Sequence, residues 1–377
     1  MKIVTIIGAR PQIIKAAALS RAIQTHYADR IREVIVHTGQ HYDDNMSQVF
    51  FDELGIPNPD YNLHVGSASH GVQTARMIEG IEKILVDERP DGIVLYGDTN
   101  STLAGAVAAA KIHIPVIHIE AGLRSFNKRM PEEINRIVCD HCSTLLFTPT
   151  PAGFDNLAKE GFRMDNEGPY TIDNPKVYHC GDIMYDNSLY FSTIADQKAG
   201  LLLELGLLDQ PYVLTTLHRD SNTDHPLRLN AILDALLELS KDIAILLPLH
   251  PRTRKMLDQL VDRDKIDRLT HQERIHLIDP VSFLEMILLE KHAQLVLTDS
   301  GGVQKESYFF KKPCVILRPE TEWVEIVKTG SASLADADYG QIIEASRRYL
   351  QHPPKDFPAL FGDGHAAVFM LEKMLLL

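Results

Sequence analysis

Short apolar runs rich in β-branched residues recur along this chain, and most of them end in glycine or polar residues. The first series comprises KIVTII (2–7), EVIVHT (33–38), GIVLYG (92–97), PVIHIE (115–120) and TLLFTP (144–149). The second series comprises VYHC (177–180), YVLTTL (212–217), AILLPL (244–249), RIHLI (274–278), LVLTD (295–299) and CVILR (314–318). Because the runs lack a strict apolar–polar alternation, they predict parallel strands that are buried on both faces of a sheet.

The segments between these runs have the apolar spacing of helices. The clearest examples are Ile13–Gln24, Gly71–Val86, Thr102–Lys111, Leu227–Leu239 and Val303–Phe310. Strands that alternate with helices predict an α/β fold with a parallel, doubly wound sheet. Two series predict two such domains, and the polar stretch 166–175, which carries Gly and Pro, predicts the boundary. We therefore expect domains at 1–172 and 173–363, with a final helix, 364–377, that packs back on the first domain.

Composition narrows the class of protein. The chain has 377 residues, 45% of them hydrophobic and 24% charged, which suits a globular protein with a large core. Its net charge of −13 argues against a nucleic-acid partner, which would select a basic face. No apolar run reaches the roughly 18–20 residues of a membrane span. The N-terminus fits a first strand better than a signal peptide, and four cysteines form no disulfide framework, so we expect a cytoplasmic protein.

The segments that follow the strands carry the functional information, because ligands of open α/β sheets bind at the carboxyl ends of the strands. In the first half these segments are GARPQ (8–12), TGQH (38–41), GDTNST (97–102) and EAGLRS (120–125). In the second half they are LHRD (217–220), LHPR (249–252), DSGG (299–302) and RPETEW (318–323). Both halves therefore place candidate functional groups at this edge.

The segment TDSGGVQKE (298–306) is the candidate phosphate site. A strand runs into Ser300, Gly301 and Gly302, where a helix begins. Glycines permit a close approach of the backbone, and free N–H groups at a helix start attract a diphosphate. Glu306 lies about one turn further on, where its carboxylate fits ribose hydroxyls. An ordinary strand–helix turn has the same pattern, so the segment alone leaves both interpretations open.

Further donors follow other strands. GARPQ is not the G-x-G-x-x-G fingerprint of dinucleotide-binding folds. Arg10 in that segment offers a planar guanidinium suited to phosphate, or it is a surface residue at a turn. His218 with Arg219, and His250 with Arg252, end two strands of the second half and supply donors where an anion can bind.

The acidic residues of the first half fit either an active site or a charged helix. Asp98 and Glu120 each follow a strand, so both can serve as an acid or a base at the sheet edge. Residues 131–136 predict a helix that begins at a proline, with Glu132 and Glu133 in its first turn, where negative charge is favoured anyway. Glu132 and Arg136 also have the i,i+4 spacing of an ordinary ion pair. Ser101 or Thr102 is the expected N-cap after Asp98.

Three other patterns carry little weight. Cys139 and Cys142 form a C-x-x-C, but on a predicted helix with no second pair, so an inert thiol pair is a better interpretation than zinc. Tyr308 and Lys312 have the Y-x-x-x-K spacing of short-chain dehydrogenases without the glycine fingerprint. Ser300 lacks the G-x-S-x-G elbow of hydrolases. We therefore expect no metal and no nucleophilic serine.

Taken together, these segments resemble the non-hydrolysing UDP-N-acetylglucosamine 2-epimerases. The matching motifs, in the family's order, are GARPQ, TGQH, GDTNST, HIEAGLRS, MPEEINR, LHR, LHPR and TDSGG, and they extend from residue 8 to about 325. Each motif alone is weak, whereas the ordered set is specific. The resemblance implies two Rossmann-like domains in a glycosyltransferase-B arrangement, a UDP-sugar in the interdomain cleft, and a homodimer.

The resemblance also implies a role for individual residues. The family's catalytic positions correspond here to Asp98, Glu120, Glu132 and His218. Its contacts with UDP correspond to Arg10, Lys15, Arg136, His218, Ser300, Gly301, Gly302 and Glu306. The hydrogen on C2 of such a sugar is not acidic, so the family eliminates UDP anti across C1–C2 and adds it back with the proton on the opposite face. That route requires no cofactor, in keeping with the missing nicotinamide fingerprint.

The expected reaction interconverts UDP-N-acetylglucosamine and UDP-N-acetylmannosamine, for surface polysaccharide precursors. The segments SFNKRMPEE (125–133) and TEWVE (321–325) look like those of members that act on UDP-2,3-diacetamido-2,3-dideoxyglucuronate, whose C6 carboxylate Arg129 would bind. The Gln and Arg that complete the family's activating second site near TGQH have no match here. Three rivals remain: a hydrolysing epimerase, a glycosyltransferase-B transferase and a catalytically silent UDP-sugar sensor.

Overall fold

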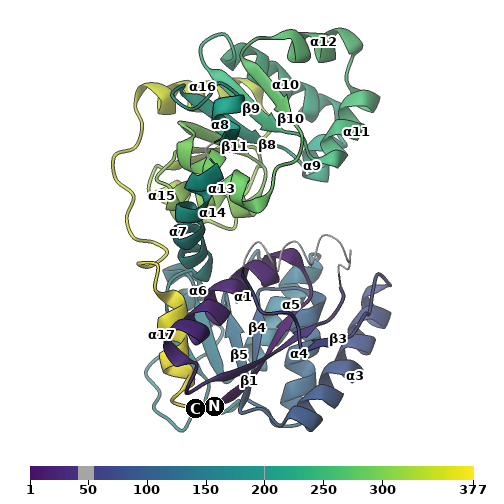
Figure 1. Cartoon of the computed structure of the whole chain (residues 1–377), viewed down its shortest axis with the longest axis vertical. Helices are drawn as coiled ribbons and strands as arrows, with labels where there is room; N and C mark the ends of the chain where they lie inside the picture. The colour runs from purple at the N-terminus through teal and green to yellow at the C-terminus, as the bar shows by residue number, and fades with distance from the viewer. Residues whose placement is uncertain (41–54, 199) are drawn as a thin grey trace. The chain divides into compact units, whose positions relative to one another are not determined.

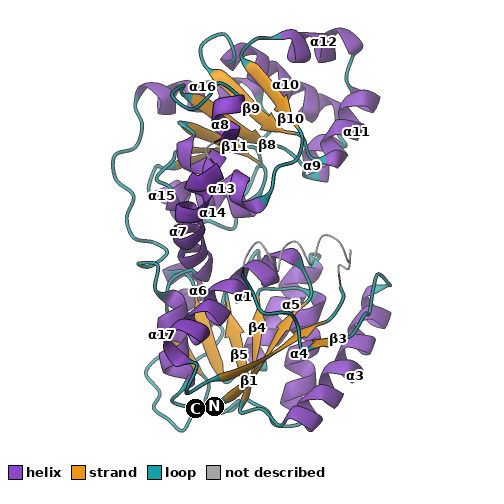
Figure 2. Ribbon diagram, viewed as in Figure 1, coloured by secondary structure: helices purple, strands orange, loops and turns teal. Residues whose placement is uncertain are grey.

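The computed structural model describes residues 1–40, 55–198 and 200–377 of the chain. The chain forms two compact units, one of Met1–Asn187 with Ala359–Leu377 and the other of Ser188–Pro358 (Figure 1). Each unit is built on its own parallel sheet with helices packed around it (Figure 2). The α/β class and the two Rossmann-like halves that the sequence predicts are confirmed.

The first unit contains a seven-stranded sheet in the order β3-β2-β1-β4-β5-β6-β7. Its strands are β1 (Lys2–Ile7), β2 (Arg32–His37), β3 (Tyr61–Asn62), β4 (Gly92–Tyr96), β5 (Val116–Ile119), β6 (Leu145–Thr148) and β7 (Lys176–His179). All neighbours pair in parallel, for example Tyr96 with Ile119 between β4 and β5. Consecutive residues of β1, such as Ile3 and Val4, are both fully buried, as expected for a strand covered on both faces.

The second unit contains a six-stranded parallel sheet in the order β10-β9-β8-β11-β12-β13. Its strands are β8 (Tyr212–Thr216), β9 (Ala244–Pro248), β10 (Ile275–Ile278), β11 (Leu295–Thr298), β12 (Cys314–Ile316) and β13 (Ala332–Leu334). Strand order reverses direction between β1 and β4 in the first sheet and between β8 and β11 in the second. Such switch points open a crevice at the carboxyl edge, which is where ligands of these folds bind.

The helices lie between the strands, as the apolar spacing predicts. In the first unit they are α1 (Arg10–Ala22), its π-helical extension η1 (Ile23–Tyr27), α3 (His70–Glu88), α4 (Asn100–Lys111), α5 (Pro131–His141), α6 (Pro151–Lys159) and α17 (Ala366–Met374). In the second unit they are the short 3₁₀ helix η2 (Asp196–Lys198), α8 (Gly200–Glu204), α9 (Asp220–Thr223), α10 (Pro226–Leu239), α11 (Pro251–Leu260), α12 (Arg263–His271), α13 (Phe283–His292), α14 (Gly301–Phe309), α15 (Val324–Lys328) and α16 (Tyr339–Gln351). Helix α7 (Ile183–Ala195) contains the boundary between the units.

The boundary lies further along the chain than the polar stretch 166–175 suggests. Residues 176–179 form β7, which pairs with β6 through Phe147 and Tyr178, so this run closes the first sheet instead of opening the second. The stretch before it is a loop of the first unit, held by a hydrogen bond from Asn166 Nδ2 to Pro175 O at 2.7 Å. The first unit therefore continues to Asn187 instead of ending near residue 172.

The C-terminal helix α17 belongs to the first unit and packs against α1. The Asp186 carboxylate accepts hydrogen bonds from the backbone N–H groups of Ala366 (3.1 Å) and Ala367 (2.8 Å) at the start of α17. A carboxylate at this position satisfies free N–H groups and complements the helix dipole. No helix in the described part of the chain is long and apolar enough to span a membrane.

Candidate active site

Asp98 lies directly after β4, at the carboxyl edge of the first sheet. Gly97 before it has φ 61°, a left-handed conformation that favours glycine. Thr99 after it is the N-cap of α4 and accepts a hydrogen bond from Thr102 N at 3.3 Å, so the cap is Thr99 and not Ser101 or Thr102 as the sequence suggested. The turn is therefore fixed on both sides of Asp98.

Burial and charged neighbours together shift the pKa of Asp98. The Arg136 guanidinium lies 2.6 Å from Asp98 Oδ2, while Glu120 lies close enough to repel it. Burial raises the pKa of Asp98 above its usual value, against the lowering effect of Arg136. A carboxylate with a raised pKa beside a fixed cation is suited to take up and release a proton.

Glu120 follows β5 and has φ 75°, a strained conformation for a residue with a side chain. Such a position costs on the order of 1–3 kcal/mol and persists where the surroundings over-determine it. The Glu120 carboxylate forms an ion pair with Lys15 Nζ from α1. A Cβ atom at Gly97 would lie 3.1 Å from Glu120 Oε2 and 3.3 Å from Lys15 Nζ, so the three residues converge at one point of the edge.

The helix α5 carries the other predicted acids, Glu132 and Glu133, but their contacts differ from those that the sequence predicts. Arg136 pairs with Asp98 and, at 2.8 Å, with Glu133, so the expected ion pair with Glu132 is not formed. The buried Glu133 accepts hydrogen bonds at 2.9 Å from the backbone N–H groups of Ser125 and Phe126. Burial tends to raise the pKa of Glu133, but these bonds lower it below its usual value. Glu132 is exposed in the first turn.

Two further predicted residues of the first unit, Arg10 and Arg129, lie at its surface. Arg10 is exposed at the first position of α1, after β1. Arg129 is exposed in the loop before α5, and its backbone N–H donates to Asn127 Oδ1 at 3.2 Å. His41 of TGQH lies outside the described residues, whereas Gln40 accepts a hydrogen bond from Ser101 Oγ at 2.8 Å.

In the second unit, His218 follows β8 and is organised by a fully buried carboxylate. Asp299 accepts hydrogen bonds from the backbone N–H groups of His218 (3.1 Å) and Arg219 (3.0 Å). The imidazole Nδ1 lies 3.5 Å from Asp299 Oδ1. Burial lowers the pKa of His218 below its usual value against the raising effect of Asp299, and the neighbouring His250 and Arg219 act in the same direction as burial. His218 is therefore neutral at pH 7 and can donate one hydrogen bond.

The phosphate candidate lies beside His218, at the start of α14. Ser300 is the N-cap, and its hydroxyl accepts a hydrogen bond from Val303 N at 3.5 Å. A Cβ atom at Gly301 would overlap the carboxylate of Glu322. A Cβ atom at Gly302 would lie 3.8 Å from Glu306 Oε2, so this carboxylate is close to the helix start. Free N–H groups and a carboxylate are thus brought together as diphosphate and ribose contacts require.

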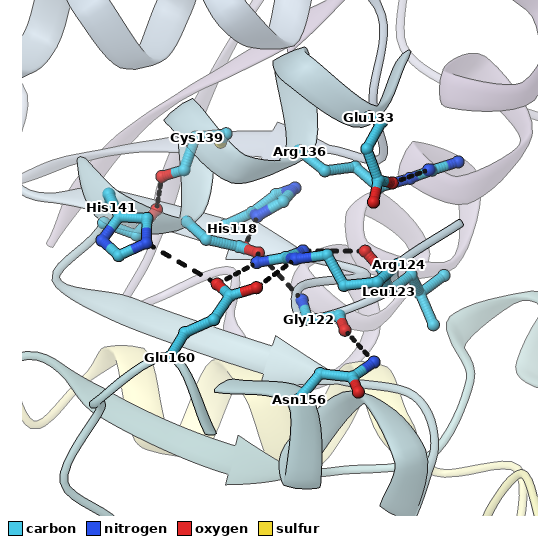
Figure 3. A network of polar contacts seen from close by, with 12 residues as sticks. His118, Gly122, Leu123, Arg124, Glu133, Arg136, Cys139, His141, Asn156 and Glu160 are labelled. Atoms are coloured by element: carbon cyan, nitrogen blue, oxygen red, sulfur yellow. Dashed lines mark hydrogen bonds and ion pairs between the residues drawn. The ribbon is translucent and has the colours of Figure 1, made fainter. Parts of the chain in front are cut away.

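A buried network that includes His118 of β5 was not predicted (Figure 3). His118 and Asp140 both have fully buried side chains, with His118 Nδ1 at 2.6 Å from Asp140 Oδ1. Arg124 joins Asp140 to Glu160, each at 2.7 Å. The sequence signal is weak, because the partners stand 22 positions apart and follow no helical or strand spacing.

In the described part of the chain, the cysteines and metal-ligating side chains do not gather into a further site. Cys139 and Cys142 are free thiols, and Cys139 is buried. Among the described residues, no three His, Cys, Asp or Glu side chains lie together as ligands of a metal ion.

The chain has two α/β units, each with a parallel sheet. One sheet edge carries carboxylates paired with cations, and the other carries a helix that begins at glycines beside a neutral histidine. Together these features define a class of enzymes that act on phosphate-linked substrates. The family model described as UDP-N-acetylglucosamine 2-epimerase matches residues 23–375, and the chain belongs to this family. It is accordingly a UDP-sugar 2-epimerase, an isomerase that acts on carbohydrates.

Individual relatives agree with this assignment. The chain is 48% identical to the UDP-2,3-diacetamido-2,3-dideoxy-D-glucuronate 2-epimerase of Pseudomonas aeruginosa, over 99% of both chains. It is 41% identical to the UDP-N-acetylglucosamine 2-epimerase of Methanocaldococcus jannaschii, over 97% of this chain and 96% of the relative. The crystal structure of the Methanocaldococcus jannaschii enzyme in complex with UDP-GlcNAc and UDP superimposes with a TM-score of 0.83 at 40% identity, over 99% of both chains.

Proposed function

We propose that this enzyme interconverts UDP-N-acetylglucosamine and UDP-N-acetylmannosamine by elimination and re-addition of UDP. The observation that carries the proposal is the convergence of two carboxylates, Asp98 and Glu120, with the cations Arg136 and Lys15 at one sheet edge. A structural relative that was crystallised with UDP-GlcNAc and UDP supports the choice of substrate.

The reaction needs a proton acceptor and a proton donor, because C2 of the sugar must lose a hydrogen and regain it on the opposite face. In the elimination the C2–H bond breaks, its proton passes to a carboxylate, and its electron pair forms the C1–C2 double bond. The C1–O bond breaks at the same time, and its electrons leave with UDP. Re-addition of UDP to C1 and protonation of C2 on the other face complete the epimerisation. Electrons and atoms balance within the substrate, so we propose that no redox cofactor takes part.

We assign the acid–base roles to Asp98, Glu120 and Glu132. The pKa of Asp98 is raised by burial, which brings it towards the range where general acid–base catalysis is efficient. Glu120 is held by Lys15, and Glu132 stands exposed in the first turn of α5. Lys15 and Arg136 also supply positive charge for the departing diphosphate.

We assign the nucleotide to the second unit, with Arg10 of the first as a further phosphate contact. We place His218 beside the diphosphate, the N–H groups after Ser300 bind it through Gly301 and Gly302, and Glu306 accepts from the ribose hydroxyls. Donors aimed at the charge that develops on a leaving group are commonly the largest contribution to catalysis.

The uronate UDP-2,3-diacetamido-2,3-dideoxyglucuronate is a second candidate substrate. The Pseudomonas aeruginosa relative named for this substrate is 48% identical. Arg129 is exposed in the loop before α5, where its guanidinium would bind the C6 carboxylate in a bidentate manner. We also propose a homodimer, as in the family that the sequence resembles, which sedimentation velocity at several concentrations would test.

One experiment separates the proposed reaction from its rivals. The enzyme is incubated with UDP-N-acetylglucosamine in D₂O and followed by NMR. We expect deuterium at C2 of both epimers while UDP remains mostly attached. Stoichiometric free UDP with free sugar would overturn the proposal in favour of hydrolysis. No exchange without an acceptor, for either UDP-sugar, would overturn it in favour of a transferase or a sensor.

A further inference from the structure

The two carboxylates at the edge of the first sheet are carried by turns that continue beyond the strands. Backbone pairing of β4 with β5 ends at Tyr96 and Ile119, and one more bond runs from Gly97 N to Ile119 O at 3.0 Å. Asp98 and Glu120 follow directly. Their relative position therefore depends on what holds the turns, in addition to the sheet itself.

A single fully buried carboxylate, that of Asp140, is linked to both turns. Its Oδ2 accepts a hydrogen bond at 3.2 Å from the backbone N–H of Gly122, two residues after Glu120. Its Oδ1 binds Nδ1 of His118, and Nε2 of the same imidazole lies 2.8 Å from the carbonyl oxygen of Gly97, one residue before Asp98.

The partners of His118 determine its protonation. A carbonyl oxygen only accepts, so Nε2 carries a hydrogen. Asp140 also faces Arg124 at 2.7 Å, which keeps the carboxylate ionised, so Nδ1 donates to it as well. Burial alone would lower the pKa of His118, but neighbouring Cys139 and Asp140 raise it well above its usual value. His118 is thus a buried imidazolium with both N–H groups engaged.

The charges of the network alternate and balance. Cationic His118 and Arg124 face anionic Asp140 and Glu160 (Figure 3). This series of ion pairs reaches the surface at His141, whose imidazole lies 3.6 Å from Glu160. Buried ion pairs are weak evidence for stability, because their desolvation offsets much of the attraction. A geometric role accounts better for one carboxylate that reaches both turns, one of which contains the strained Glu120.

We propose that His118 and Asp140 are positioning residues that hold the Asp98 turn and the Glu120 turn at the spacing required for proton transfer. The proposal rests on the acid–base roles proposed above for Asp98 and Glu120. Neither positioning residue touches the substrate, so their loss lowers kcat and leaves UDP binding unchanged.

Two substitutions of His118 each keep one of its two hydrogen bonds and remove the other. His118→Gln places an amide near the position of Nε2 and keeps a donor for Gly97 O, whereas His118→Asn places it near Nδ1 and keeps the contact with Asp140 alone. A misplacement of about 1 Å can cost about 100-fold in rate, so we expect His118→Asn to lower kcat by about 10- to 100-fold. We expect His118→Gln to retain more of the activity, and Asp140→Asn to fall between the two.

The control is Glu33→Gln in the same unit. Glu33 accepts hydrogen bonds from Thr5 Oγ1 (2.6 Å) and Ser20 Oγ (2.7 Å), away from the carboxyl edge. The substitution Glu33→Gln removes a partly buried carboxylate that has no link to either turn. The kcat of this variant should therefore stay within about twofold of the parent enzyme, as expected for sites without shared partners.

The measurements are kcat, KM, the Kd for UDP and Tm for each variant. The proposal is overturned if folded His118→Asn has a kcat like that of Glu33→Gln, or if Kd and KM rise while kcat is unchanged. If His118→Asn does not fold, Asp140→Asn, which keeps the side-chain volume, decides in its place by the same criterion. Asp98→Asn is measured in parallel. If Asp98→Asn is fully active, the proposed function fails. If Asp98→Asn is inactive and the network variants are fully active, only this inference fails.

Discussion

The carboxyl edges of the two sheets have the same topology and opposite chemistry. Each sheet consists of parallel strands, and in each the strand order reverses beside a central strand, β1 in the first and β8 in the second. At the first edge, carboxylates are paired with cations, Glu120 with Lys15 and Asp98 with Arg136. At the second edge, the buried carboxylate of Asp299 is occupied by backbone N–H groups and lies behind a helix start. One scaffold thus provides an edge suited to moving protons and another suited to binding an anion.

Burial acts on both edges in the same way, with different results. It raises the pKa of Asp98 and lowers the pKa of His218, because it disfavours the charged form of each group. A carboxylate gains basicity by this effect. A histidine becomes neutral and donates a hydrogen bond without adding a charge to the site.

The largest expected effect is on turnover, and it comes from substitutions of the acids assigned to proton transfer in the first unit. Glu120→Gln and Glu132→Gln should lower turnover by about 10²–10⁴, because each would lose a proton-transfer group. UDP affinity should change little, since the nucleotide contacts are assigned to other residues. Steady-state kinetics and calorimetry with UDP measure both quantities. Near-normal turnover in both variants would refute the proton-transfer assignment.

A second comparison concerns the histidines that follow strands. Burial lowers the pKa of His37, at the end of β2, to about 4, with His64 acting in the same direction. Between pH 6.5 and about 4 the unfolded chain therefore binds a proton that the native state does not. The contribution of His37 to the free energy of unfolding is fully present above pH 6.5 and is lost as the pH falls towards 4. The loss amounts to about 3 kcal/mol for this one group.

His37→Asn should remove this contribution to acid sensitivity. The His37 Nδ1 atom accepts a hydrogen bond from Gly39 N at 3.0 Å, and the Asn side chain can replace that acceptor. Urea unfolding at pH 7 and at pH 4.5 would be compared for both proteins. We expect the parent enzyme to lose more stability than the variant. Equal losses would show that His37 titrates normally in the native state.

A third effect concerns the glycines at the start of α14. Gly301→Ala should weaken UDP binding by about tenfold, because its Cβ would displace the end of the Glu322 side chain and add a methyl group where close backbone approach is needed. Gly302→Ala should have a smaller effect, since its nearest neighbour is at an ordinary 3.8 Å. Turnover at saturating substrate should fall less than affinity, the reverse of Glu120→Gln. If calorimetry finds unchanged affinity for Gly301→Ala, the second edge does not bind the diphosphate through this backbone.

The fold could be predicted from the sequence because buried parallel strands and amphipathic helices leave local patterns. The run at 177–180 was assigned to the wrong sheet, since its membership depends on pairing with β6 and not on its own residues. The partner of Arg136 was missed for a related reason. The i,i+4 rule considers only Glu132 on the same helix, whereas Asp98 follows β4 and forms the ion pair with Arg136 at 2.6 Å.

The candidate site was predictable as a set of motifs and not as a geometry. Strand ends marked Asp98, Glu120 and His218 correctly as edge residues. Local patterns gave no sign that Asp140 is linked to both acidic turns, or that Asp299 holds the backbone of His218. Such contacts join residues that are distant in sequence, and they follow from the assembled sheet.

The smallest expected effect concerns the sugar and not the nucleotide. Arg129 and Lys128 are exposed in the loop before α5, so they either solvate the loop or contact a substrate carboxylate. If the C6 carboxylate of the diacetamido-uronate binds Arg129, Arg129→Ala should lower kcat/KM for that substrate by about tenfold, the value of one charge-assisted contact. Lys128→Ala is the matched control, because it removes a neighbouring exposed cation that lacks the bidentate fork. Comparing kcat/KM for both UDP-sugars in the parent enzyme and both variants tests the assignment. An equal loss on both sugars, or a parent enzyme that turns over plain UDP-N-acetylglucosamine as well or better, would contradict the uronate as substrate.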